Sequence, residues 1–190
     1  MKFRDLRADE IEVRVAQAKD NGVSLLLYKD ARVDMNILDE TVGAANWQRE
    51  HYECKGNLFC RVAINTNFYL GDDFDPNWVW KADCGTESNT EAQKGEASDS
   101  FKRACFNWGI GRELYTAPFI WISAENCEGL KEINSKWKCF DTFAVQKIVI
   151  ENKRIVALAI KNAKRNKTCF IWQDKKWQAE QQKKQEQQNV

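Results

Sequence analysis

The strongest constraint on the fold is a helix with well-defined ends at residues 91–108. Thr90 and Gln93 have the spacing of a capping box, and Gly109 and Gly111 follow at the end where helices often stop in a left-handed conformation. One face is apolar through Ala97, Phe101, Ala104, Cys105 and Trp108. Lys102 and Arg103 fall outside this stripe, beside Asp99 and Phe106. We therefore expect a packed helix whose basic pair faces away from the core.

Strand patterns lie on both sides of this helix. Apolar or alternating runs predict strands at 23–29, 47–54, 58–66 and 78–83, with a turn at 55–57. Further strands are expected at 119–122, 140–150, 155–160 and 168–172. Residues 8–19 are interpreted as a first helix, because Ile11, Val15 and Ala18 recur on one face and Asn21-Gly22 would end it. The predicted fold class is α+β, with an antiparallel meander crossed by a helix.

The composition sets the number of domains and the kind of binding surface. With 190 residues, of which 43% are hydrophobic, the chain is expected to form one domain over residues 1–177. Its net charge is only +1, so binding to nucleic acid would require basic residues gathered on one face. Residues 178–190 are almost wholly Gln, Lys, Glu and Asn, and we expect them to be disordered.

The cysteines and the apolar runs indicate a cytoplasmic protein. The seven cysteines include no Cys-x-x-Cys pair and lie mostly in apolar patterns, which favours reduced thiols. Neither a signal segment at the start nor a run of about 20 apolar residues is present, so no membrane contact is expected.

Catalytic and metal chemistry is weakly supported. His51 is the only histidine, and the cysteine spacings suggest neither a zinc site nor a nucleophile with a histidine base. Asp72, Asp73, Asp75 and Asp83 could hold Mg²⁺ in a nuclease, although Gly-Asp-Asp-x-Asp-Pro is also ordinary turn chemistry. We predict no catalytic residue, no metal and no cofactor.

The remaining candidates are basic and aromatic side chains. Six basic residues could line a track for phosphates: Arg14, Lys81, Lys94, Lys102, Arg103 and Arg112. Taken singly, each could also be an ordinary solvated surface charge. The eight tryptophans offer either stacking surfaces or core mass, and Trp78, Trp80 and Trp108 are interpreted as core.

Four segments in this order resemble the Rad52 superfamily of single-strand annealing proteins, and in particular its bacteriophage Sak-like branch. They are LDETVGAANW at 38–47, WVWKADCG at 78–85, KGEASDSFKRA at 94–104 and GIGRELY at 109–115. The resemblance covers residues 8–122, with 123–177 as a β-rich extension. It implies a β-β-β-α core that, in this chain, would carry an N-terminal helix and an added C-terminal β-hairpin, with many copies joined into an oligomeric ring.

The resemblance also implies a function. Single-stranded DNA would lie in a basic groove of the ring, with its bases free to pair, and annealing would need neither ATP nor a metal. Lys102 and Arg103 match the groove-floor pair, Arg14 matches a backbone-contacting arginine, and Lys94 matches a further basic position. Phe106 replaces an additional arginine and the segment 85–90 is short, which argues against a second, outer DNA site.

The predicted function is therefore non-enzymatic single-strand annealing in recombination and repair, in a bacterial or phage-infected cell. Two alternatives stay open from the residues alone: a Mg²⁺-dependent nuclease using Asp72, Asp73 and Asp83, and a protein-interaction scaffold. The tail after Trp177 is a candidate contact for a single-strand binding protein.

Overall fold

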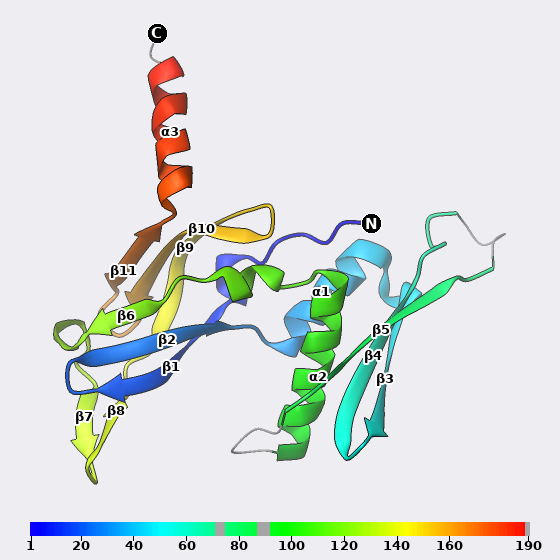
Figure 1. Cartoon of the computed structure of the whole chain (residues 1–190), viewed down its shortest axis with the longest axis horizontal. Coiled ribbons are helices and arrows are strands. Elements are labelled where there is room, and N and C mark those ends of the chain that lie inside the picture. The colour runs from blue at the N-terminus through cyan, green and yellow to red at the C-terminus, as the bar shows by residue number, and fades with distance from the viewer. Residues whose placement is uncertain (71–74, 87–91, 189–190) are drawn as a thin grey trace. The chain divides into compact units, whose positions relative to one another are not determined.

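A computed structural model describes residues 1–70, 75–86 and 92–188 (Figure 1). The chain divides into two compact units. The first contains Met1–Asp5 and Asp30–Arg112, and the second contains Leu6–Lys29 and Glu113–Val190. Within the described residues, the helices are too short or too polar to cross a membrane.

The first unit is built on an antiparallel three-stranded sheet crossed by a helix. The sheet order is β3 (Trp47–Cys54), β4 (Asn57–Asn65) and β5 (Trp78–Cys84), and the helix is α2 (Ala92–Trp108). Lys55 and Gly56 have φ values of 53° and 74°, the left-handed pair that a tight two-residue hairpin requires. The predicted meander, turn and helix are thus confirmed, while the proposed capping box at Thr90 and Gln93 lies outside the described residues and side chains.

The C-terminal end of α2 is a Schellman motif. Gly109 has φ 98°, its N–H donates to Phe106 O at 2.9 Å, and the N–H of Ile110 donates to Cys105 O at 3.2 Å. Ile110 and Cys105 are both fully buried, at the two positions where this motif is usually accompanied by apolar side chains. The glycine signal in the sequence therefore marked the true end of the helix.

The apolar face of α2 forms the core of the first unit. Phe101, Ala104 and Cys105 are fully buried, as are Val62 and Ile64 on β4. The indole N–H of Trp108 donates to Val62 O at 3.0 Å, and Leu58 N donates to Glu96 Oε1 at 3.1 Å. The helix is therefore attached to the central strand by both apolar burial and hydrogen bonds.

A second helix of this unit, α1 (Ala31–Val42), was not predicted. Asp30 caps its start by accepting from Arg32 N at 2.8 Å, and Gly43 at φ 83° ends it. Its buried residues are Val33, Asp34, Ile37, Leu38 and Val42. The capping residue, the apolar spacing and the glycine were all present in the sequence as signals.

Gly85, directly after β5, allows close contact between that strand and α2. A Cβ atom there would overlap Glu96 O and lie 2.9 Å from Ser100 N, and both of these are backbone atoms. We expect Gly85→Ala to lower the free energy of unfolding by about 2 to 3 kcal/mol, as overpacking does. Urea denaturation would measure this. Gly56→Ala is the comparison: no atom lies within 4 Å, so only backbone strain of about 1 kcal/mol is expected. Equal losses in the two variants would contradict the packing argument.

The second unit contains a six-stranded antiparallel sheet, as far as the described residues define it. Its order is β11 (Lys167–Gln173), β10 (Arg154–Asn162), β9 (Phe143–Glu151), β1 (Glu12–Lys19), β2 (Gly22–Tyr28) and β6 (Ile120–Ser123). Strands β7 (Leu130–Ile133) and β8 (Lys136–Cys139) form a separate pair, and the core includes Val23, Ile122, Ile155 and Ile160. Short 3-10 turns occur in this unit at Ala8–Glu10 and Ala124–Asn126, in the first unit at Ala44–Asn46, and at Arg112–Thr116, which begins on the last residue of the first unit.

The prediction of an N-terminal helix at 8–19 is wrong, because Glu12–Lys19 forms β1 and Ala8–Glu10 forms only a 3-10 turn. Val13 and Val15 alternate as in a strand, and the register then shifts between Val15 and Gln17. Because of this bulge, Ala18 lies on the same face of the strand as Val15. The three-residue spacing between the two resembles a helical repeat, which explains the wrong prediction. Asn21-Gly22, interpreted as a helix stop, instead belongs to the hairpin that joins β1 to β2.

The C-terminal region also differs from the expectation. Strands lie where they were predicted at 140–150, 155–160 and 168–172, but they belong to the large sheet rather than to an appended hairpin, since Glu12 of β1 pairs with Ala144 of β9. The tail 178–190 was expected to be disordered; its described part, up to residue 188, belongs to a helix after β11, α3 (Lys175–Gln188), and residues 189–190 lie outside the described structure. Asp174 starts this helix by accepting from Lys176 N and Trp177 N, and these backbone bonds lower its pKa.

Candidate nucleic-acid interface

Lys102 and Arg103 lie next to the buried stripe of α2 and are both partly exposed. Their neighbours Phe101 and Ala104 are fully buried against the sheet, so the helix cannot rotate to bury the basic pair without exposing its core. The outward direction predicted from helical spacing therefore agrees with the observed packing.

Arg103 connects α2 to the edge strand β5. Its Nε lies 3.3 Å from Asp83 Oδ1, and 43% of its side chain remains exposed. Asn107, one turn later, donates from Nδ2 to Asp83 Oδ2 at 3.3 Å and to Ala82 O at 3.0 Å. Asp83 is thus engaged by two residues of α2, which gives this proposed nuclease carboxylate a structural role. Asp72 and Asp73 lie outside the described residues.

Lys102 acts on the start of α1. Hydrogen bonds from Arg32 hold the pKa of Asp30 at about 2, and the charge of Lys102 adds a smaller attraction. Arg32 Nε lies 3.0 Å from Asp30 Oδ1, and the Arg32 side chain is 81% exposed. Lys102, Arg32 and Asp30 together carry one net positive charge on the surface of the first unit.

Lys81 and Arg112 cap the C-terminal end of α2. Lys81 Nζ donates to Asn107 O at 3.0 Å, and Arg112 donates to Phe106 O at 2.8 Å and to Asn107 O at 3.0 Å. Cations at this end of a helix stabilise its unpaired carbonyls and its dipole. Both side chains also lie over aromatic rings of the helix, Lys81 over Trp108 and Arg112 over Phe106. These two predicted DNA ligands therefore have a demonstrable structural role.

The other two predicted ligands are placed as follows. Lys94 belongs to α2, but its side chain is outside the described part of the chain. Arg14 lies on β1 of the second unit, is 64% exposed, and pairs with Glu12 at 2.8 Å beside the ring of Tyr28. The common groove predicted for Arg14 and Lys102 stays a prediction, because the two residues belong to different units.

The opposite face of the three-stranded sheet presents residues that the sequence analysis missed. Arg61 lies 4.4 Å from the ring centre of Trp80 and 5.9 Å from that of Tyr52, and Tyr52 stacks on Phe59 at 5.6 Å. Trp80 is 38% exposed, so its interpretation as a core residue is wrong. The signal was available as period-two alternation, because Arg61 and Trp80 lie on the face opposite to Val62 and Lys81.

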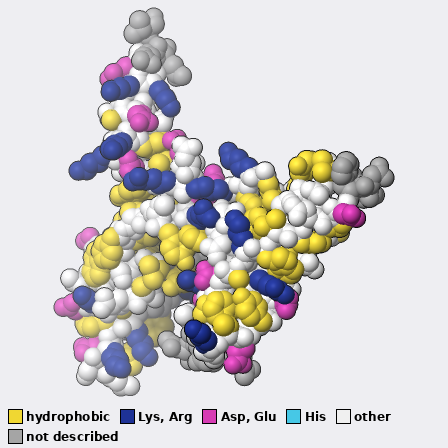
Figure 2. All heavy atoms as spheres, turned by 45° about the vertical axis from the view of Figure 1, so that its right-hand side comes forward, with side chains coloured by type: hydrophobic (Ala, Val, Ile, Leu, Met, Phe, Trp, Pro, Cys, Tyr) yellow, Lys and Arg dark blue, Asp and Glu magenta, His cyan; other side chains and the backbone are white. Residues whose placement is uncertain are grey.

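The charge distribution matches the near-neutral composition. Figure 2 shows Lys and Arg side chains scattered among hydrophobic and acidic ones over the surface in view. A basic surface on a single chain would therefore consist of small local groups, such as the Lys102 and Arg32 pair.

Comparisons with known proteins place these features in a family. No curated protein and no solved structure matches the chain significantly. A family described as Rad52/22 family double-strand break repair protein matches residues 4–130, a span that contains β1 to β6 and both α1 and α2. Since this match covers well over half of the 190 residues, the chain belongs to the Rad52/22 family of double-strand break repair proteins.

Proposed function

We propose that the chain binds single-stranded DNA and anneals complementary strands during recombination and repair, without ATP and without catalysis. The observation that carries this proposal is the family match over residues 4–130, which includes all of α2 and its basic pair. Members of a family of double-strand break repair proteins act on broken DNA, whose processed ends supply single strands.

The surface chemistry of α2 supports binding through phosphates. Lys102 and Arg103 are partly exposed on a helix that is anchored by the fully buried apolar residues Phe101, Ala104 and Cys105, so they present cations from a rigid element. Cations held in this way contact the DNA backbone and make no base-specific contacts, as annealing of arbitrary sequences requires. Phe106, which replaces a further arginine and lies beneath Arg112, favours a single inner DNA site.

Assembly into a ring would join these small groups into one track. β3 and β5 are the edge strands of the described three-stranded sheet, and an edge strand offers free backbone groups to a second copy. A ring built in this way repeats Lys102 and Arg103 once per subunit, so a chain of net charge +1 still presents a continuous basic surface.

A strand-annealing assay tests the proposal directly. Two complementary oligonucleotides, one with a fluorophore and one with a quencher, should pair faster with the protein than without it, in EDTA and in the absence of ATP. An end-labelled single strand incubated with the protein and Mg²⁺ should remain intact. Acceleration that requires ATP, or shortening of the labelled strand in Mg²⁺, would contradict the proposal, and the second outcome would favour a nuclease.

A further inference from the structure

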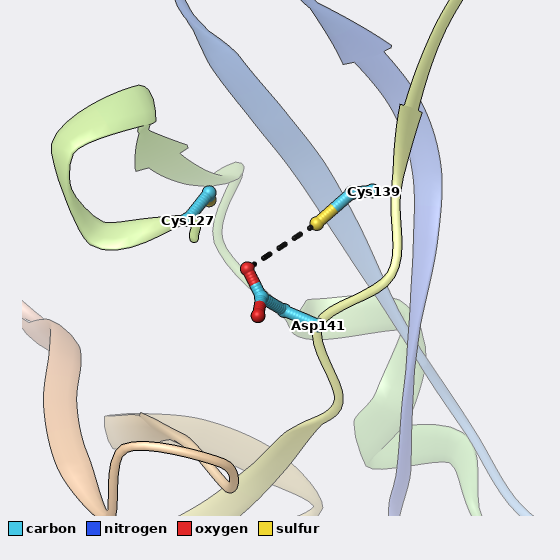
Figure 3. A group of neighbouring side chains, drawn as sticks. All are labelled: Cys127, Cys139 and Asp141. Atoms are coloured by element: carbon cyan, nitrogen blue, oxygen red, sulfur yellow. Dashed lines mark hydrogen bonds between the residues drawn. The ribbon is translucent and has the colours of Figure 1, made fainter. Parts of the chain in front are cut away.

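Three potential metal ligands meet in the second unit. Cys127 follows the 3-10 turn Ala124–Asn126, Cys139 ends β8, and Asp141 lies between β8 and β9. Their sulfur and carboxylate oxygen atoms all lie within 4.8 Å of one another. Figure 3 shows the Asp141 carboxylate directed toward the Cys139 sulfur, with Cys127 on the neighbouring segment.

The carboxylate of Asp141 is buried and only half satisfied. Asp141 is 8% exposed, and its Oδ2 accepts from Gly129 N at 2.9 Å and from the Cys139 thiol at 3.7 Å. Its Oδ1 is buried without a hydrogen-bond partner among the described residues. Leaving a buried carboxylate oxygen unpaired is costly, and a bound cation is one way to satisfy it.

The set of donors selects the class of metal. Two thiols and one carboxylate suit Zn²⁺ or a similar thiophilic ion, whereas Ca²⁺ and Mg²⁺ prefer oxygen ligands alone. With Zn–S bonds of about 2.3 Å, tetrahedral geometry separates two sulfur ligands by about 3.8 Å. The ligand atoms now lie within 4.8 Å of one another, so each sulfur would have to move by about 1 Å or less to reach the zinc-bound spacing.

We propose that Cys127, Cys139 and Asp141 bind one Zn²⁺ ion, with water as the fourth ligand. Cys139 is partly exposed, which gives the ion and the water access to the site. Binding forms two Zn–S bonds and one Zn–O bond to Asp141, which displace all but one of the waters on the hydrated ion, and each thiol releases its proton to solvent. Two thiolates and one carboxylate around a divalent ion leave the site with one net negative charge.

This ion would have a structural role. It would connect the β7–β8 pair, which ends at Cys139, to the turn after β6, which carries Cys127. The β7–β8 pair contributes only four residues per strand, and a two-stranded pair of this length is marginally stable by itself. Zinc should therefore stabilise the second unit, independently of whether the chain anneals DNA.

Burial also affects the two thiols of the proposed zinc site. Burial is the largest cause that raises the pKa of Cys127 to about 12, and it also raises that of Cys139. Zn²⁺ must therefore displace a proton from each thiol when it binds, which makes the binding stronger as the pH rises.

Metal analysis of the full-length protein tests the proposal. After the protein has been incubated with Zn²⁺ and dialysed against metal-free buffer, mass spectrometry should find one zinc per chain, and the melting temperature should rise above that of the EDTA-treated protein. Co²⁺ in place of Zn²⁺ should give the thiolate-to-metal charge-transfer absorption. Cys127→Ser and Cys139→Ser should each lose the zinc, and Asp141→Asn should weaken binding at least tenfold, while Cys54→Ser, which changes an exposed thiol on β3, should retain one zinc.

Three outcomes would overturn the proposal. One is a wild-type protein that holds no zinc after dialysis. Another is equal zinc content in Cys127→Ser and Cys54→Ser, which would place the metal elsewhere. The third is a mass lower by two hydrogens with a Cys127–Cys139 link, which would identify a disulfide. Circular dichroism of the metal-free wild-type protein and variants separates loss of ligands from loss of folding.

Discussion

Replacing Lys102 and Arg103 together by alanine should weaken binding to single-stranded DNA about 25-fold at about 0.1 M salt. Each phosphate contact contributes a slope of about −0.7 to the logarithm of affinity against the logarithm of salt concentration, which is about fivefold per contact at that salt. The slope should therefore become shallower by about 1.4 in the double variant. Fluorescence anisotropy of a labelled oligonucleotide across a salt series measures both quantities.

Two further variants separate charge from structure. Arg103→Lys keeps the positive charge near Asp83 and should retain most of the affinity. Lys55→Asn removes one charge from the β3–β4 turn, where the left-handed conformation at φ 53° tolerates asparagine. Its effect on the affinity and on the salt slope should be much smaller than that of the double variant. An unchanged salt slope in the double variant would refute the assignment of Lys102 and Arg103 as phosphate ligands. Because Arg103 also holds Asp83, the melting temperature of the double variant must be measured alongside.

Phe101→Ala should produce a large loss of stability in the first unit, about 3 to 5 kcal/mol in the free energy of unfolding. Phe101 is fully buried, stacks against Trp47 with ring centres 6.1 Å apart, and lies beneath the guanidinium of Arg49 at 4.8 Å. Alanine would leave a cavity where α2 crosses the sheet and would remove both ring contacts. Urea denaturation followed by tryptophan fluorescence and by circular dichroism measures the effect.

Phe106→Ala is the matched control on the same helix. Phe106 is partly exposed and contacts Arg112 at the surface, with 5.5 Å between the guanidinium and the ring centre. Its removal should cost about 1 kcal/mol, the scale of an exposed cation–π contact. If the two variants lost equal stability, the apolar face would not be the element that holds α2 on the sheet.

The sequence predicted the elements whose signals are local. The end of α2 followed from Gly109 and Gly111, because a left-handed residue is easiest for glycine. The strands β3, β4 and β5 followed from alternation and from the turn at Lys55-Gly56, and the outward position of Lys102 and Arg103 followed from helical geometry. Ring assembly, the bacteriophage branch and DNA binding stay predictions, and the last of these applies to Arg14, Lys81, Lys94, Lys102, Arg103 and Arg112 alike.

Only the tertiary structure decided the features that join distant residues. The sequence pattern of β1 indicated a helix, whereas its bulge and its pairing with β2 and β9 make it a strand. Neither pairing partner can be identified from a local pattern. The bond from Lys81 to the end of α2 and the attachment of Arg103 to Asp83 likewise join an edge strand to a helix that lies 20 or more residues away in the sequence. Cys127, Cys139 and Asp141 flank the β7–β8 pair, but their spacing matches no common zinc motif, so the sequence analysis missed the cluster. The sequence by itself determined the capped helix, the meander and the basic pair, since each depends on backbone preference and periodicity over a few neighbouring residues.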